Sequence, residues 1–255
     1  MTTEQDSRKF RRLRQYNLAM ALLHGAQGAA LLILSNDFAL PVTATFMEGP
    51  PGSGVPDPTT LFDLPIGPGV AAFVLISAAA HAVLVLPGVF DWYRRNLERG
   101  RNDARWIEYS VSASIMIVLI AMLTGISDVA ALIGLFGVNA SMIFFGLIQE
   151  HAGRPGAGSL LPFWLGCIVG AVPWIAIAIY VVSPGTAANP PGFVYGIFVS
   201  LFTFFNVFAL NMWLQYRRIG PWRDYLFGES VYVLLSLTAK SALAWQVFFP
   251  TLLDS

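Results

Sequence analysis

Seven long runs of apolar residues divide the chain, separated by shorter polar segments rich in arginine, glycine or proline. Each run has about the 20 residues that a helix needs to cross roughly 30 Å of hydrocarbon. The runs span residues 16–34, 67–90, 106–125, 129–149, 160–182, 192–214 and 225–249. The pattern predicts an all-α membrane protein in which residues 1–255 form a single domain, a bundle of seven transmembrane helices.

The connections between the runs differ in length. Residues 36–66, between the first two runs, are rich in proline and glycine, and they are long enough for a short pair of β-strands on the membrane surface. The other connections are short, so consecutive helices should pack antiparallel in one bundle. The first run lacks a small-residue cleavage site at its end and is therefore predicted to be a retained span rather than a signal peptide.

Composition agrees with a membrane protein. The chain is 56% hydrophobic and only 12% charged, whereas a soluble domain carries about 25% charged residues. Its formal net charge is zero, so no general attraction to nucleic acid is implied. The single cysteine, Cys167, excludes an internal disulfide.

Basic residues predict the orientation of the bundle. Of the fifteen Lys and Arg, all but one fall before the first run or in alternate connections. They are Arg8, Lys9, Arg11, Arg12, Arg14, Arg94, Arg95, Arg99, Arg101, Arg105, Arg154, Arg217, Arg218 and Arg223. The positive-inside rule therefore places the N-terminus in the cytoplasm and, after seven crossings, the C-terminus outside.

The exception is Lys240, which lies in the middle of the last apolar run as "SLTAKSALAW". A lysine at that depth costs several kcal/mol, so it needs a partner or a covalent task. One reading is a snorkelling or paired structural lysine. The other is an amine that forms a Schiff base with a carbonyl compound, with Glu108 balancing the charge of a protonated imine. That pairing requires the third helix to begin about a turn before its apolar run.

Further polar residues lie at the same depth as Lys240. Counted from the predicted cytoplasmic ends, His24, His81, Asn139 and Lys240 all lie about 12–15 Å deep. They predict a polar cavity that could accept a proton, although each histidine could equally be a packing residue. They are too few for a metal site. Glu229 is predicted to be a solvated carboxylate at a helix start.

Several motifs resemble those of heliorhodopsins, the microbial rhodopsins of inverted topology. They are "SLTAKSALAWQ", "RWIEYS", "NDFALP", "GPPG", "GVNASM", "LLPFW" and "PGFVYG", and they cover nearly the whole chain. The resemblance implies all-trans retinal bound covalently to Lys240, with Glu108 as counterion. The other residues it implies at the site are Ser236, Met142, Trp164 and Phe205 around the chromophore, and His24, His81, Ser77 and Asn139 in the polar cavity. Ala113 stands where members of the family have serine.

The same comparison of residues predicts a light sensor. Ion-pumping rhodopsins usually have a second carboxylate one turn before the lysine and another along the third helix, where this chain has Ser236 and Leu119. The expected protein is a non-enzymatic photoreceptor in the cell membrane, surrounded by lipid and signalling to a soluble cytoplasmic partner. The alternative is a light-gated proton or cation channel or a weak ion pump. A homodimer is implied by the resemblance and by a GxxxG motif at Gly166 and Gly170.

Overall fold

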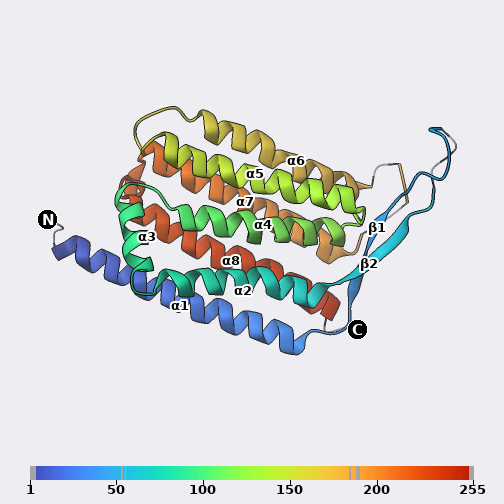
Figure 1. Cartoon of the computed structure of the whole chain (residues 1–255), viewed down its shortest axis with the longest axis horizontal. Coiled ribbons are helices and arrows are strands. Elements are labelled where there is room, and N and C mark those ends of the chain that lie inside the picture. The colour runs from blue at the N-terminus through green and yellow to red at the C-terminus, as the bar shows by residue number, and fades with distance from the viewer. Residues whose placement is uncertain (1–3, 53, 55, 184, 188–189, 253–255) are drawn as a thin grey trace.

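The computed structural model describes residues 4–52, 54, 56–183, 185–187 and 190–252. The helices are α1 (Glu4–Leu34), α2 (Ile66–Leu84), α3 (Val89–Glu98), α4 (Asp103–Leu123), α5 (Val129–Ala152), α6 (Leu161–Val182), α7 (Gly192–Arg217) and α8 (Tyr225–Leu252), with a 3₁₀ turn η1 (Gly220–Arg223) before α8. All except α3 and η1 contain an apolar segment long enough to cross a membrane, seven spans in the described part of the chain. The predicted seven-helix bundle is confirmed (Figure 1).

A two-stranded hairpin projects from one end of the bundle, as the long first connection predicted (Figure 1). Strand β1 (Ala39–Ala44) pairs antiparallel with β2 (Thr59–Pro65). The hairpin is tied to the bundle through Thr43, whose backbone N–H donates to the carbonyl of Ser127 at 2.8 Å. The end of the bundle that carries β1 and β2 is called the hairpin end below, and the opposite end, which carries α3, is called the α3 end.

Helix α3 is an element that the apolar pattern did not predict, because the second run was expected to continue to residue 90. Helix α2 stops at Leu84, and the chain turns through Pro87 and Gly88 before α3 begins. Proline disfavours helix in the residue before it, and Gly88 has a φ of +79°, which favours glycine. The buried side of α3 then packs Tyr93 and Leu97 against Phe10 and Leu13 of α1.

Helices α4 and α8 are the most enclosed of the seven spans. In the most apolar 18-residue stretch of each helix, 61% of α4 and 50% of α8 are buried inside the bundle. Helix α4 also begins at Asp103, three residues before the predicted run, because the Asn102 side chain caps it by accepting from the backbone N–H of Arg105. Both helices therefore lie in the core of the bundle, and they are the helices on which Glu108 and Lys240 lie.

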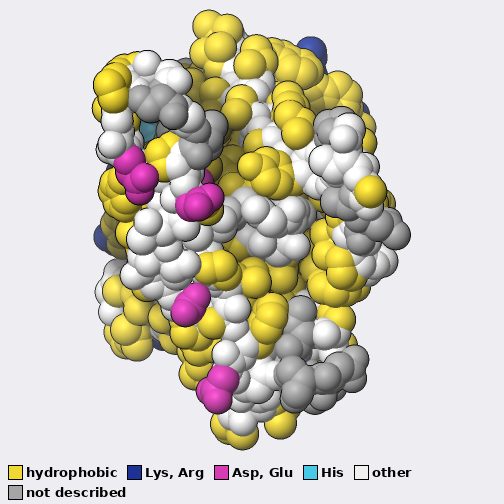
Figure 2. All heavy atoms as spheres, turned by 90° about the vertical axis from the view of Figure 1, so that its right-hand side faces the viewer, with side chains coloured by type: hydrophobic (Ala, Val, Ile, Leu, Met, Phe, Trp, Pro, Cys, Tyr) yellow, Lys and Arg dark blue, Asp and Glu magenta, His cyan; other side chains and the backbone are white. Residues whose placement is uncertain are grey.

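Charge is distributed unequally between the two ends. Figure 2 looks onto the hairpin end and shows acidic side chains there, with lysine and arginine confined to the margins. The arginines in the first turns of α1 and those that follow α2, α5 and α7 belong to the opposite, α3 end. This separation agrees with the prediction that the α3 end faces the cytoplasm.

Candidate functional site

Helices α4 and α8 bring Glu108 and Lys240 together in the core. Lys240 Nζ lies 3.1 Å from Glu108 Oε1, and their side chains are 4% and 9% exposed. Lys240 also donates to Ser236 Oγ, one turn earlier on α8, at 2.8 Å. Ser77 on α2 donates to the same Glu108 oxygen at 2.6 Å. The earlier start of α4 that this pairing required is therefore observed. The buried amine contacts one carboxylate and one hydroxyl, and a second hydroxyl donates to the carboxylate.

Lys240 forms part of the wall of an apolar cavity enclosed by α4, α5, α6, α7 and α8. Its lining is almost entirely apolar or aromatic and includes Met142 and Phe205, as expected from the sequence. The other lining residues used below are Trp106, Tyr109, Gly146, Phe163 and Phe208. An apolar cavity with one amine in its wall, beside one carboxylate, fits a conjugated aldehyde such as retinal. The chemistry of these residues therefore fits the predicted chromophore.

The placement of Trp164 was wrong. Its side chain is 52% exposed on the outside of the bundle and is absent from the lining of the cavity, where Phe163 lies instead. The side of α6 that faces the cavity consists of Phe163, Gly166 and Cys167, which follow the three- and four-residue spacing of a helical face. Trp164 points about 100° away from Phe163, toward the surroundings of the bundle.

The GxxxG motif packs within the chain. A side chain at Gly166 would meet Phe145 and the backbone of Met142, and one at Gly170 would meet the Met142 side chain. Both glycines therefore allow α6 to approach α5 closely. Because this intramolecular contact accounts for the motif, it gives no support for a dimer.

The two histidines lie together on the α1–α2 side of Glu108. Their rings stack with centroids 5.8 Å apart and an angle of 9° between the planes. His81 Nδ1 lies 2.8 Å from Asn17 Oδ1. His24 is completely buried, and neither ring nitrogen has a hydrogen-bond partner among the described residues. Buried polar atoms are normally satisfied by protein or by ordered water, so this side of the site is suited to water and to proton exchange.

Asn139 lies against another part of α4. Its side chain donates to Ser114 Oγ at 3.1 Å and lines neither the apolar cavity nor the polar cavity described below. Helix α5 packs against α4 and α6, not against α1 or α2. Its polar residue therefore meets the Ser114 face of α4, away from the histidines, and the prediction that Asn139 joins their cavity was wrong.

The arrangement agrees with a comparison against known families. The model of the heliorhodopsin family matches residues 13–252. The chain belongs to the heliorhodopsin family. No protein with curated annotation matches this heliorhodopsin. Among solved structures, the transmembrane domain of the rhodopsin phosphodiesterase of Salpingoeca rosetta is similar, with a TM-score of 0.66 over 96% of this chain and 87% of that chain. At 12% identity, that likeness shows the rhodopsin fold alone.

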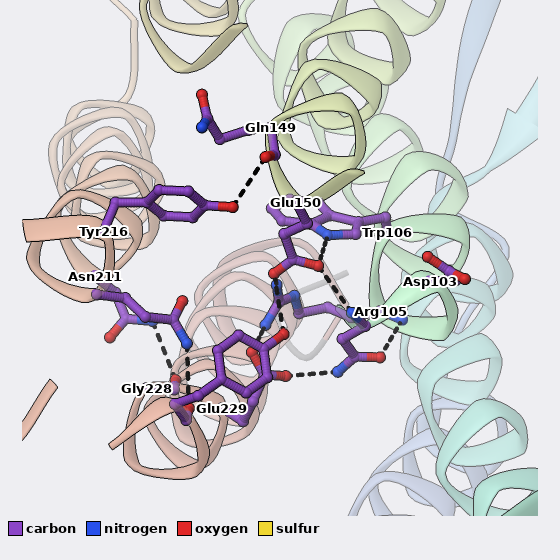
Figure 3. Close-up of polar contacts among 12 residues, drawn as sticks. Asp103, Arg105, Trp106, Gln149, Glu150, Asn211, Tyr216, Gly228 and Glu229 are labelled. Atoms are coloured by element: carbon purple, nitrogen blue, oxygen red, sulfur yellow. Dashed lines mark hydrogen bonds and ion pairs between the residues drawn. The ribbon is translucent and has the colours of Figure 1, made fainter. Parts of the chain in front are cut away.

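This heliorhodopsin has a second buried charged group, which was not predicted from the sequence; Figure 3 shows it around Arg105, Glu150 and Glu229. Arg105 on α4 forms ion pairs with Glu150 on α5 and with Glu229 on α8. The arginine side chain is 5% exposed and the two glutamates 1% each. We call these three residues the Arg105 cluster. The prediction that Glu229 is solvated was wrong, because Asn102 and Arg105 cover it.

Neutral donors complete the Arg105 cluster. Trp106 Nε1 donates to Glu150 at 2.6 Å, and the backbone N–H of Asn102 donates to the same carboxylate at 2.8 Å. The Asn102 side chain donates to Glu229 at 2.6 Å. Each buried carboxylate therefore accepts from more than one donor, as a buried charge requires. One signal in the sequence pointed to Glu229, since it lies on the same helical stripe as Ser236 and Lys240.

Proposed function

We propose that this heliorhodopsin is a light sensor in which Lys240 holds all-trans retinal as a Schiff base and Glu108 is the counterion. Family membership and the rhodopsin fold support a retinal-binding photoreceptor in general. The observation that supports the finer assignment is the position of Lys240, a buried amine in the wall of an apolar cavity, 3.1 Å from one carboxylate. A lysine kept only for packing would not need an apolar cavity beside it.

Retinal, when bound, supplies light absorption and a change of shape by isomerisation. The residues of the chain do the rest. Glu108 balances the positive charge at the Lys240 nitrogen, and the Ser77 hydroxyl holds the carboxylate in place. Met142, Phe163 and Phe205 exclude water from the apolar part of the cavity. A proton that leaves the nitrogen enters the polar region around Glu108, His24 and His81.

Signalling rather than pumping is favoured by the part of α4 between Glu108 and the hairpin end. Beyond the buried serines Ser110, Ser112 and Ser114, its buried side is apolar and includes Met116, Ile117, Leu119 and Ile120. Residues 109–123 contain no aspartate, glutamate, histidine, lysine or arginine. A proton crossing that half of the bundle would have no relay group on α4, and moving a bare charge through apolar protein is prohibitively costly. We therefore propose that helix movement is transmitted to a partner at the basic α3 end.

A visible spectrum of the purified protein with all-trans retinal tests the chromophore. The wild-type protein should absorb visible light, and hydroxylamine under illumination should bleach it. Lys240→Ala should show no visible band at all. Lys9→Ala is the matched control, because Lys9 is the other lysine of the chain and lies 2.7 Å from Asp224 at the exposed α3 end. A normal visible band in Lys240→Ala would reject the covalent site.

Two further measurements test the counterion and the signalling role. Glu108→Gln should shift the absorption maximum, because a neutral amide cannot balance the charge on the nitrogen; an unchanged spectrum would assign the counterion to another group. Vesicles that contain the protein should show neither a photocurrent nor a light-driven pH change. A reproducible photocurrent would establish the alternative, a light-gated channel or weak pump.

The remaining proposals follow from the family. We propose that the protein is a homodimer in the cell membrane, that it has no enzymatic activity and that its partner is a soluble cytoplasmic protein. The mass of the detergent-solubilised protein, measured by light scattering, tests the dimer. A monomeric mass at every protein concentration measured would refute the dimer.

A further inference from the structure

Two buried ion pairs, called ties below, join α4 to α8, and the acid and the base are on opposite helices in the two pairs. In the first tie the acid, Glu108, lies on α4 and the base, Lys240, on α8. In the second the base, Arg105, lies on α4 and the acid, Glu229, on α8. The tyrosines between them connect the two levels, since Tyr109 Oη donates to the carbonyl of Tyr232 at 3.1 Å and the Arg105 guanidinium stacks 3.8 Å from the Tyr232 ring centre.

A small polar cavity of about 30 Å³ runs between the two ties, which is room for a water molecule. Its lining includes Glu108 and His81 as well as Asn102, Arg105 and Glu229. Arg105 Nε and Tyr232 Oη, whose residues also line this cavity, are buried and have no hydrogen-bond partner among the described residues. Such atoms are suited to bind water, and water in this cavity would lie among residues of both ties.

The Arg105 cluster contains two carboxylates for one guanidinium. With both glutamates ionised it carries one excess negative charge in a site shielded from solvent. A proton added to either carboxylate would remove that excess and still leave the arginine paired with the other. The site therefore has the capacity to hold one more proton, and that proton belongs to the pair of glutamates rather than to one of them.

Tyrosines and basic residues surround the Arg105 cluster. Tyr93 of α3 lines the polar cavity, and burial raises its pKa, so it stays a neutral hydroxyl. Tyr225 of α8 donates to Glu150 at 3.2 Å, and Tyr216 of α7 donates to the carbonyl of Gln149 at 3.0 Å. On the far side of Glu150, the solvent-facing hollow is lined by Arg99, Arg101, His151 and Arg154.

We propose that the Arg105 cluster is the group that receives the proton leaving the Lys240 nitrogen after illumination, and that its protonation loosens the tie between α4, α5 and α8 at the α3 end. The N–H bond at Lys240 breaks, its electron pair stays on the nitrogen, and an O–H bond forms on Glu229 or Glu150 by way of the polar cavity. The proton returns at the end of the cycle. The proposal rests on the proposed function, because it needs a chromophore on Lys240.

The competing reading is that the cluster is a static clamp whose protonation never changes. Light-minus-dark infrared spectroscopy of the retinal-loaded, full-length protein separates the two readings, because a newly protonated carboxyl adds a carbonyl stretching band. The wild-type protein should gain this band. The double variant Glu150→Gln/Glu229→Gln should lose it. Glu48→Gln, a change at an exposed residue between β1 and β2, is the control and should keep it.

Glu229→Asp is a second variant that tests the proposal even if the double variant does not fold. It keeps a carboxylate and should shift the light-induced band rather than abolish it. The proposal is overturned if the band persists unshifted in both variants, or if it disappears only in Glu108→Gln. It is also overturned if the wild-type protein gains no band while its visible spectrum reports that the nitrogen has lost its proton. Absence of any visible band with retinal in the dark would instead reject the proposed function.

Discussion

Removing the single cation from the Arg105 cluster should be among the most damaging changes to this protein. Arg105→Met keeps most of the length and apolar stem of the side chain but leaves Glu150 and Glu229, both 1% exposed, without a positive partner. Breaking one buried ion pair by removing one partner costs about 3–5 kcal/mol. Here one substitution breaks two pairs, so the loss of unfolding free energy should lie at the upper end of that range.

The loss should be recovered when the orphaned charges are removed as well. Replacing a whole buried ion-pair cluster by neutral residues is often close to neutral in stability. The triple variant Arg105→Met/Glu150→Gln/Glu229→Gln should therefore regain most of the stability, since the glutamine oxygens still accept from Asn102 and Trp106. A simple loss of packing would predict the reverse, a triple variant that is less stable than the single one.

Denaturation in detergent, followed by the helical circular dichroism signal, measures both variants. Arg95→Met, at an exposed position on α3, is the control and should change the unfolding free energy by no more than about 0.5 kcal/mol. The reasoning is refuted if Arg105→Met remains within about 1 kcal/mol of the wild-type protein, or if the triple variant is as unstable as the single one. Either result would mean that the cluster does not hold the three helices together.

Three further predictions test the packing around the site. Gly146→Ala should destabilise the protein by about 1–3 kcal/mol, because its Cβ would overlap an indole ring of α4, whereas Gly134→Ala on the same helix has open space and should stabilise it by about 0.5–1 kcal/mol in the same denaturation assay. Phe163→Ala should shift the visible absorption maximum and Trp164→Ala should not; the opposite result would restore the tryptophan to the cavity. Asp128→Ala should cost about 1 kcal/mol of unfolding free energy and Asp128→Asn much less, because the side chain caps α5.

The seven spans and the central ion pair could be predicted from the sequence for the same physical reason. A backbone in hydrocarbon must satisfy its own hydrogen bonds, so apolar runs of the right length become helices with little dependence on their neighbours. A lysine in such a run is so costly that a partner must exist, and Glu108 is the carboxylate at a suitable depth on a neighbouring span. Both inferences use depth along the helix axis, which residue counting supplies.

Rotation about the helix axis is what residue counting does not supply. Asn139 faces Ser114 and not the histidines, and Trp164 faces outward while its neighbour Phe163 faces the cavity. These directions depend on which helix packs against which. For α5 and α6 they are fixed by close contacts with a neighbouring helix at Gly146 and Gly166. A long apolar span offers few polar residues from which such a rotation could be read.

Arg105 and Glu229 show the same limit at the ends of the spans. Charge counting treats an arginine beside an apolar run as part of a solvated loop, but an additional helical turn of α4 carries Arg105 inside the bundle. On one rigid helix, Glu229 lies eleven residues before Lys240, about 16 Å along the axis. A rotation of α8 that follows a change at Lys240 would therefore also strain the Arg105–Glu229 tie, whether or not a proton travels between them. The infrared and stability experiments can separate these two forms of coupling, because a purely mechanical link would make Glu229→Gln alter the cycle without removing any carboxyl band.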